Sequence, residues 1–440
     1  MNRRLSLLAS LIAITAATTA SAQDEGAPPV EVEVVGGQNA QVTIAVPAMP
    51  AQGSSEALGR QIAQVISSDL RSTGVFTPLG PNGIGGYSVA QARSPAFGEW
   101  RGAGASALVS GYVEERPDGR IIVACLLHDV SAGRQLASQA FTVAAADWRR
   151  AAHKCADIVY ARLTGEGAFL NTRIVYVAET GPKTNRVKRI ALMDSDGSNV
   201  RYLTAGRSNV TTPRFSPSGE QLVYTGMLAR KPRVFVIDVA SGAERLLVPG
   251  GAITFAPRFS PDGRRIVFSW AQGGNTDIFI VGASGGVPTR LTSTPGTDTS
   301  PSFSPDGRRI VFESERSGTQ QLYVMGVDGT GQRRISFGGG RSASPVWSPK
   351  GNLIAFTRIG GGGFRIGVMD PSGGGERLLT NAWQDEGPSW APNGQFVLFH
   401  RTAQGSGNGT LFAVPAFGGP PRRMPTPQGG SDPSWSPLDD

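Results

Sequence analysis

Short hydrophobic runs separated by turn residues fill the C-terminal two-thirds of the chain. A run such as 265–268 (Arg-Ile-Val-Phe) is followed by a second run such as 277–281, then by a glycine-rich turn and a third run. Apolar runs of this length, bounded by Gly, Pro, Asn and Asp, are typical of β-strands. The pattern therefore predicts many short strands joined by tight turns.

A repeated motif, Pro-x-aromatic-Ser/Ala-Pro-x-Gly, punctuates these runs. Its six copies begin at Pro213, Pro257, Pro301, Pro345, Pro388 and Pro433, with spacings of 44, 44, 44, 43 and 45 residues. The second proline and the glycine suit a tight turn in the first five copies, whereas the sixth has the second proline, Pro437, without the glycine. Each unit holds four strand-like runs. Four strands in about 40–45 residues are typical of a β-propeller blade.

The two ends of the repeat region complement one another. Residues 173–177, 189–193 and 200–203 resemble the later strands of a blade, but they have no first strand before them. The sixth motif copy, in contrast, supplies a first strand with no blade after it. We therefore expect 433–436 to pair with 174–179 and to close a six-bladed propeller over residues 172–440, because closure protects sheet edges from aggregation.

Residues 38–168 have a different pattern, which alternates strand-like and helix-like segments. Expected strands are 41–46, 75–76, 106–113, 120–127 and 139–143, and expected helices are 56–72 and 146–163, ending near Gly74 and Gly165. The predicted fold class is therefore α+β/β multidomain: a small mixed α/β domain followed by a six-bladed β-propeller closed between the chain termini. A high content of turn residues, 59 Gly and 31 Pro, agrees with the many turns.

The first 37 residues carry two further segments. Arg3 and Arg4 precede an apolar stretch over 5–19, which ends in Ala20-Ser21-Ala22. This is the pattern of a secretory signal peptide over residues 1–22, and its apolar part is shorter than the ~20 residues that span a bilayer. No other long apolar run is present, so we expect no transmembrane helix. Residues 23–37 are acidic and contain proline, and we expect a mobile, partner-binding segment there.

Charge does not indicate a nucleic-acid-binding protein. The chain has 42 basic and 34 acidic residues, a net charge of +8 that falls to +6 without Arg3 and Arg4. The excess is spread out, and we interpret the short basic run 186–189 as a solvated strand edge rather than a nucleic-acid site.

Two cysteines lie in the first domain, Cys125 in a strand-like run and Cys155 in a helix-like run. If that helix packs on that strand, the two can form a disulfide, which an exported protein would retain. Two buried free thiols are the alternative, and both remain open at this point.

Candidate catalytic and metal motifs have plainer interpretations. Residues 282–286 match Gly-x-Ser-x-Gly, but the equivalent positions of other repeats are hairpin turns, so we predict a turn and not a nucleophile. The three histidines, His128, His153 and His400, lie far apart and without metal-ligand spacing. Residues 194–197 resemble the start of a calcium loop, but lack its distal Glu. We therefore predict no catalytic site, no metal and no cofactor.

The segments just before each motif are the best candidate binding surface, because the chain must pass near the propeller axis there. Most of their residues are small and polar, and several are acidic. Two interpretations are open: ordinary solvated loops, or a funnel mouth that accepts a partner. The candidate residues are Ile253, Ala256, Asp298, Thr299, Ser300, Asp385, Glu386 and Asp432.

The whole mature chain resembles the TolB family of periplasmic Tol–Pal proteins. The resemblance rests on the six repeats, on the closing Pro-Ser-Trp-Ser-Pro at 433–437, and on the first-domain segments 45–47, 69–74 and 148–165. It implies a monomeric, non-enzymatic periplasmic adaptor that supports outer-membrane integrity and constriction at division. The lipoprotein Pal would bind at the propeller mouth, with Ile253, Ala256 and Thr299 as favoured contacts. TolA would bind the segment 23–37, at Glu31, Val32, Glu33 and Val34.

The alternative is an envelope propeller enzyme or a lectin that acts on glycan or peptide. It would need catalytic carboxylates or a bound metal in the central channel, and the acidic residues expected at the mouth keep it open.

Overall fold

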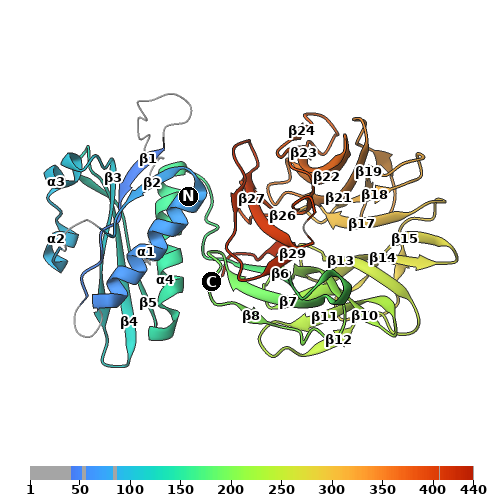
Figure 1. Ribbon diagram of the computed structural model, residues 1–440, viewed down its shortest axis with the longest axis horizontal. Helices are drawn as coiled ribbons and strands as arrows, with labels where there is room; N and C mark the ends of the chain where they lie inside the picture. Colours follow the sequence, from blue (N-terminus) through green and yellow to red (C-terminus); the bar gives the residue numbers. More distant parts are fainter. Residues whose placement is uncertain (1–40, 52–55, 83–86, 406, 440) are drawn as a thin grey trace, which may run out of the picture.

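The computed structural model describes residues 41–51, 56–82, 87–405 and 407–439. The predicted signal peptide, the predicted segment 23–37 and its residues Glu31, Val32, Glu33 and Val34 lie outside the described residues. Figure 1 shows two parts, a helix-and-sheet part and a β-propeller, which are the architecture that the repeat and the first-domain pattern predict.

A five-stranded mixed sheet forms the first part, in the order β2-β1-β3-β4-β5. Its strands are β1 (Val42–Ala45), β2 (Phe76–Leu79), β3 (Ala107–Glu115), β4 (Arg120–Asp129) and β5 (Arg134–Ala144). Strand β1 lies between β2 and β3 and runs parallel to both, whereas β3, β4 and β5 form an antiparallel meander. The expected mixed sheet is thus confirmed.

Two long helices, α1 (Glu56–Thr73) and α4 (Trp148–Thr164), lie between this sheet and the propeller (Figure 1). Gly74 and Gly165 follow them with φ of 78° and 72°, a left-handed conformation that glycine adopts without steric cost. Two short helices that the sequence pattern did not predict, α2 (Val89–Arg93) and α3 (Phe97–Gly102), precede β3.

Cys125 in β4 and Cys155 in α4 form a disulfide, with Cα atoms 5.8 Å apart. Of the two open alternatives, the structure therefore contains the cross-link. It ties α4 to the middle of the sheet, inside the buried core of this part of the chain.

The propeller has six four-stranded blades, each an antiparallel sheet in which the first strand faces the axis. Blade 1 holds β9 (Val210–Phe215), β10 (Gln221–Leu228), β11 (Lys231–Asp238) and β12 (Glu244–Leu246), and blade 2 holds β13 (Ile253–Phe259), β14 (Arg265–Gln272), β15 (Asn275–Gly282) and β16 (Thr289–Arg290). Blade 3 holds β17 (Asp298–Phe303), β18 (Arg309–Ser314), β19 (Gln321–Gly326) and β20 (Arg333–Arg334), and blade 4 holds β21 (Arg341–Trp347), β22 (Ile354–Gly360), β23 (Gly363–Met369) and β24 (Arg377–Leu378). Blade 5 holds β25 (Asp385–Trp390), β26 (Phe396–Thr402), β27 (Gly409–Pro415) and β28 (Arg422–Arg423).

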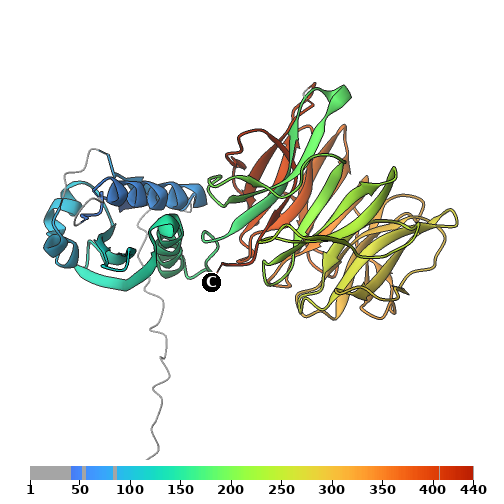
Figure 2. The same ribbon diagram turned by 90° about the horizontal axis from the view of Figure 1, so that it is seen from below.

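Blade 6 is built from both ends of the propeller region. Its strands are β29 (Gly429–Trp435), β6 (Arg173–Thr180), β7 (Val187–Asp194) and β8 (Arg201–Tyr202). In the β29–β6 pair, Gly429 lies opposite Glu179 and Trp435 opposite Ile174. The predicted closure is therefore confirmed. Figure 2 shows the first propeller strands, in green, running beside the last, in red, at the side that faces the first domain.

The propeller core consists of layers between neighbouring blades. One aromatic side chain in the second strand of each blade is buried at an equivalent position: Tyr224, Phe268, Phe312, Phe356, Phe399 and Tyr176. Each fully buried aromatic ring removes a large apolar area from water, worth on the order of 2–3 kcal/mol. The repeat thus supplies one anchor per blade, and the blades position the loops and inner strands around the axis.

Candidate functional site

The inner strands β9, β13, β17, β21, β25 and β29 line the propeller axis, and each contains the same irregularity. Pairing with the second strand shifts register just before the motif proline in all six blades. The residue before that proline is left-handed each time, with φ from 49° to 65°: Thr212, Ala256, Ser300, Ser344, Gly387 and Asp432. Only one of them is glycine, although a left-handed residue with a side chain costs about 1–2 kcal/mol.

Hydrogen bonds between blades hold several of these left-handed residues. Their backbone N–H groups donate to a side chain from the second strand of the preceding blade: Ala256 to Thr225 Oγ1 (3.1 Å), Ser300 to Ser269 Oγ (3.3 Å), Ser344 to Glu313 Oε2 (3.0 Å) and Asp432 to His400 Nδ1 (3.4 Å). Each bond joins neighbouring blades near the axis. These hydrogen bonds therefore compensate the backbone strain of the left-handed residues around the axis, which we call the left-handed ring.

The expectation of a ring of loops at the mouth is wrong, because these segments belong to the inner strands. The expectation of accessible acidic side chains at the mouth is also wrong for two residues. Asp298 and Asp385 are fully buried and paired, Asp298 with Arg316 (2.7 Å) and Asp385 with Arg401 (2.6 and 2.9 Å). Buried carboxylates keep their charge only when paired in this way, so neither offers a free carboxylate at the mouth.

The structure does bring the remaining predicted residues together around the axis. Ile253, Ala256 and Ser300 are half-buried at the entry of the channel, and Thr299 is buried beside them. Glu386 accepts a hydrogen bond from Gln384 Nε2 (2.7 Å), and Asp432 Oδ2 accepts one from the backbone N–H of Thr212 (3.3 Å). All six predicted segments thus meet at one end of the channel.

Exposed apolar side chains lie on this same end of the propeller, a feature that the sequence pattern did not reveal. Leu228 ends β10 at the β10–β11 hairpin, whereas Phe337 and Trp383 lie between an outer strand and the next inner strand. Because strand direction alternates within each blade, all three positions are at the end where the inner strands begin. Their side chains are 47%, 70% and 51% exposed. We call this end, with Leu228, Ile253, Phe337 and Trp383, the mouth face.

The Gly-x-Ser-x-Gly segment forms the turn between β15 and β16, with Gly285 and Gly286 at positive φ, so its interpretation as a turn is confirmed. A different serine does contact a histidine, since Ser110 Oγ lies 2.9 Å from His128 Nε2. Both side chains are buried in the first domain, and Ser110 also donates to the carbonyl of Ala92 (2.8 Å). Within the described ranges no carboxylate contacts His128, and the pair anchors helix α2 to β3.

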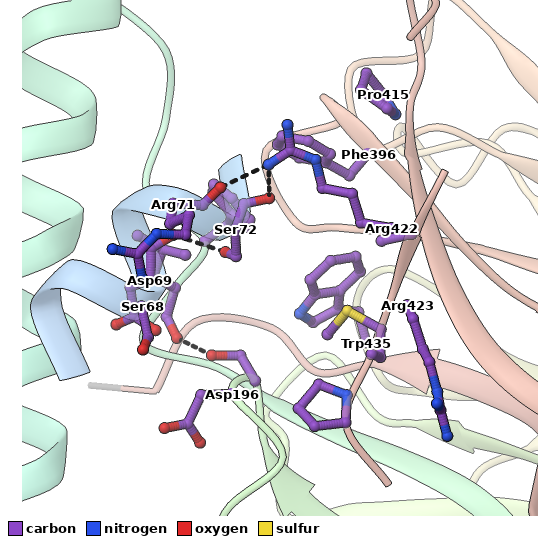
Figure 3. Close-up of a pocket in the computed structure, with 16 residues that line it drawn as sticks. Ser68, Asp69, Arg71, Ser72, Asp196, Phe396, Pro415, Arg422, Arg423 and Trp435 are labelled. Carbon is purple, nitrogen blue, oxygen red and sulfur yellow. Dashed lines mark hydrogen bonds between the residues drawn. The ribbon is translucent and has the colours of Figure 1, made fainter. Parts of the chain in front are cut away.

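A cavity of about 440 Å³ lies between the two parts of the chain (Figure 3). Asp69 and Ser72 of α1 line it on one side, and Phe396, Arg422 and Trp435 of the propeller line it on the other. Arg422 Nη1 donates to the carbonyl oxygens of Arg71 (2.6 Å) and Ser72 (2.9 Å), at the C-terminal end of α1. A cation at this end of a helix also interacts favourably with the helix dipole.

An ion-pair cluster beside this cavity joins the two parts. His153 Nδ1 lies 2.6 Å from Asp69 Oδ2, and His153 Nε2 lies 3.9 Å from Asp196 Oδ2 in the β7–β8 turn. Arg149 Nη2 contacts the same Asp196 oxygen at 2.5 Å. Burial lowers the pKa of His153, but the charges of Asp69 and Asp196 outweigh burial and raise it to about 9.

This cluster offers three ligand atoms within 4.8 Å of one another, so its residue types suit a metal ion. Two of those atoms are already engaged, however, Asp69 Oδ2 by His153 and Asp196 Oδ2 by Arg149. The arrangement is therefore that of an imidazolium between two carboxylates. The sequence pattern missed it because Asp69 and Asp196 lie 84 and 43 positions from His153.

Comparisons with known proteins agree on one family. The model of the TolB β-propeller domain matches residues 160–439, and that of the TolB amino-terminal domain matches residues 30–136. The chain is 59% identical over 414 residues to a Tol-Pal system protein TolB from Zymomonas mobilis, covering 92% of this chain and 90% of that protein. It is 56% identical to one from Rhizorhabdus wittichii over the full length of both.

A solved structure shares both parts of the fold. The crystal structure of TolB from Acinetobacter baumannii superposes with a TM-score of 0.79 at 26% identity, covering 90% of this chain and 97% of that one. Over the ranges that the structure describes, no helix combines the length and apolarity needed to cross a membrane. With a propeller-domain match over more than half of its length and relatives of this similarity, the chain belongs to the TolB family of Tol-Pal system proteins.

Proposed function

We propose that this chain is a non-enzymatic periplasmic adaptor of the Tol–Pal system. Its propeller mouth binds the lipoprotein Pal, and its segment 23–37 binds TolA, so that the chain supports outer-membrane integrity and constriction at division. Membership of the TolB family supports a role in this system. The TolA contact rests on the family resemblance and falls on Glu31, Val32, Glu33 and Val34.

The observation that carries the Pal proposal is the chemistry of the mouth face. Half-buried Ile253 and exposed Leu228, Phe337 and Trp383 offer apolar contacts around the channel entry. Apolar side chains exposed at one end of the propeller favour a protein partner there, since water is released when they are covered. A small, preorganised ring of inner strands with Ala256 and Thr299 at its edge suits the close approach of a partner loop.

The same geometry counts against a glycan-active propeller. A glycosidase requires two carboxylates that reach the substrate. Here Asp298 and Asp385 are buried and each is bonded to an arginine. Glu386 and Asp432 also accept hydrogen bonds from the protein, so the mouth carboxylates serve the structure of the channel.

Binding of purified Pal, measured by isothermal titration calorimetry, tests the proposal. We expect Ile253→Glu and Trp383→Glu to weaken binding at least tenfold, because a carboxylate replaces an apolar contact. Leu378→Glu is the matched control: Leu378 is 46% exposed on the outer strand β24, away from the mouth face. No binding by the wild type, or equal binding by all variants, would refute the Pal site.

The division of the two sites has its own test. Deleting residues 23–37 should abolish capture of purified TolA while Pal binding stays unchanged. Loss of both partners on this deletion would show that the assignment of separate sites is wrong. Turnover of a glycan or peptide by the wild type, without either partner, would favour the enzyme alternative.

A further inference from the structure

Two arginines occupy the middle of the propeller channel. Arg214 and Arg258 stand at the second position of the motif in blades 1 and 2, where the other blades have Ser302, Val346, Ser389 and Ser434. The channel consists of a narrow waist of about 40 Å³ and a funnel of about 400 Å³ toward the Ser-Pro-x-Gly turns. Among the described residues, Arg214 and Arg258 are the only ones that line both spaces.

Neither guanidinium has a carboxylate partner in the part of the chain that the structure describes. Arg214 Nη1 donates to three carbonyl oxygens, those of Pro213 (2.8 Å), Asp432 (3.2 Å) and Pro433 (3.3 Å). Burial lowers the pKa of Arg214, although the charge of Asp432 opposes this. Burial also lowers the pKa of Arg258 well below its usual value, and the neighbouring charge of Arg214 lowers it further.

This charge balance differs from that of the rest of the channel wall. Asp298 and Asp385 each have an arginine at salt-bridge distance, so those charges cancel locally. The two channel arginines instead repel one another inside a confined space. A buried charge without a bonded counter-charge is unfavourable, and the charge of Asp432 offsets this only at Arg214. An anion between the two guanidinium groups would offset their mutual repulsion.

Hydroxyl groups at the same motif position in other blades add neutral donors to the channel wall. Ser302 and Ser389 line the funnel at the same level, and their oxygens accept the backbone N–H groups of Trp347 (3.3 Å) and Trp435 (3.2 Å). Because these bonds use only the lone pairs, each hydroxyl proton remains free to point at a ligand. Guanidinium forks with hydroxyl donors are the groups that recognise tetrahedral oxyanions.

We propose that the propeller channel binds a tetrahedral oxyanion of the phosphate or sulfate class between Arg214 and Arg258, where the waist meets the funnel. Two positive charges match a dianion better than a carboxylate or chloride. The site requires neither the mouth face nor residues 23–37, although Ala256, a proposed Pal contact, also lines the waist.

Titration calorimetry of the full mature chain with inorganic phosphate tests this site, at constant ionic strength and with chloride as the reference anion. We expect one phosphate per chain and at least tenfold weaker binding by Arg258→Ser. That variant introduces the residue that three other blades carry at this position, so the fold tolerates it. Arg264→Ser, an exposed arginine in the turn of the same blade, should bind phosphate like the wild type.

Three results would overturn the proposal: no phosphate-specific heat in the wild type, equal phosphate binding by Arg258→Ser and the wild type, or acetate binding tighter than phosphate. If Arg258→Ser loses its native circular dichroism spectrum, Arg258→Gln takes its place. A phosphorus NMR titration of the wild type then provides a second readout, in which phosphate line broadening must saturate at one equivalent. Broadening that does not saturate would also refute the site.

Discussion

Trp435 donates its indole N–H to the hydroxyl of Thr172 across 2.9 Å, although the two residues are 263 positions apart. The same indole meets the ring of Phe169 edge-on at 6.0 Å, and Phe169 stacks on Phe396 at 4.9 Å. The closing strand, the linker between the two parts and blade 5 therefore share one aromatic cluster.

Truncating Trp435 should destabilise the propeller at its seam, the pairing of β29 with β6. We expect Trp435→Ala to lower the free energy of unfolding by about 3–5 kcal/mol, because it leaves a cavity and removes the hydrogen bond that the Thr172 hydroxyl accepts. Urea denaturation followed by circular dichroism measures the change. Trp383→Ala is the control, since that ring is 51% exposed, and its effect should stay within about 0.5 kcal/mol. Equal effects of the two substitutions would contradict the role of the seam.

Removing the imidazole of the interface cluster should change how stability depends on pH. The pKa of His153 is about 9, above its ordinary value of 6.5, so its contribution is complete below pH 6.5. It is lost as the pH rises through 9, and the full difference corresponds to about 3 kcal/mol. The gap in melting temperature between wild type and His153→Gln should therefore be widest at pH 6 and narrow by pH 10. A gap that stays constant across this range would refute the charged cluster.

The ring of left-handed residues predicts an unusual stabilising substitution. Ala256 has φ of 52°, so Ala256→Gly should raise the free energy of unfolding by about 1 kcal/mol. Gly387→Ala should lower it by at least as much, because the added Cβ would also lie 3.2 Å from His400 Nδ1. Ala343 is the control residue, because it lies in the extended part of β21, one position before the left-handed Ser344. Ala343→Gly should lower the free energy of unfolding by about 1 kcal/mol. If Ala256→Gly lowers the free energy of unfolding as Ala343→Gly does, the left-handed residues around the axis are not strained.

Two adjacent carboxylates of β25 should respond very differently to removal. Asp385 is fully buried and bonded twice by Arg401, so Asp385→Ala leaves a charge unpaired and should lower the free energy of unfolding by about 3–5 kcal/mol. Glu386 is partly exposed, and Glu386→Ala should change it by less than about 1 kcal/mol. Chemical denaturation of the two variants gives the comparison. A stability loss for Glu386→Ala as large as that for Asp385→Ala would contradict this distinction between a buried, paired carboxylate and a partly exposed one.

The blade count and the seam could be predicted because the repeat is local in sequence. Six motifs at near-constant spacing determine the number of blades, and the unmatched strands at 173–177 and 433–436 can only complete each other. Helices α1 and α4 were predicted because each spans more than four turns with a periodic apolar face. Helices α2 and α3 have five and six residues, too few for any periodicity.

The site was harder to predict, because its chemistry depends on contacts between distant residues. Asp298 and Asp385 look like surface acids in sequence, and only their burial and their contacts with Arg316 and Arg401 show that they are internal. The left-handed ring has no glycine signature, since five of its six members have side chains. The channel arginines were visible within the motif copies, where Arg214 and Arg258 break the pattern of small residues, and this asymmetry was the available signal.

Blade 6 also sets an order of events during synthesis. A ribosome that has made the chain as far as residue 428 has supplied every strand of blades 1–5 and three strands of blade 6, but the innermost strand β29 is still missing. Until then β6 presents an open edge beside the axis, and the ring can only be a gapped arc. The circle can therefore close only after β29 has been made, and a chain that stalls before this strand keeps the edge of β6 unpaired.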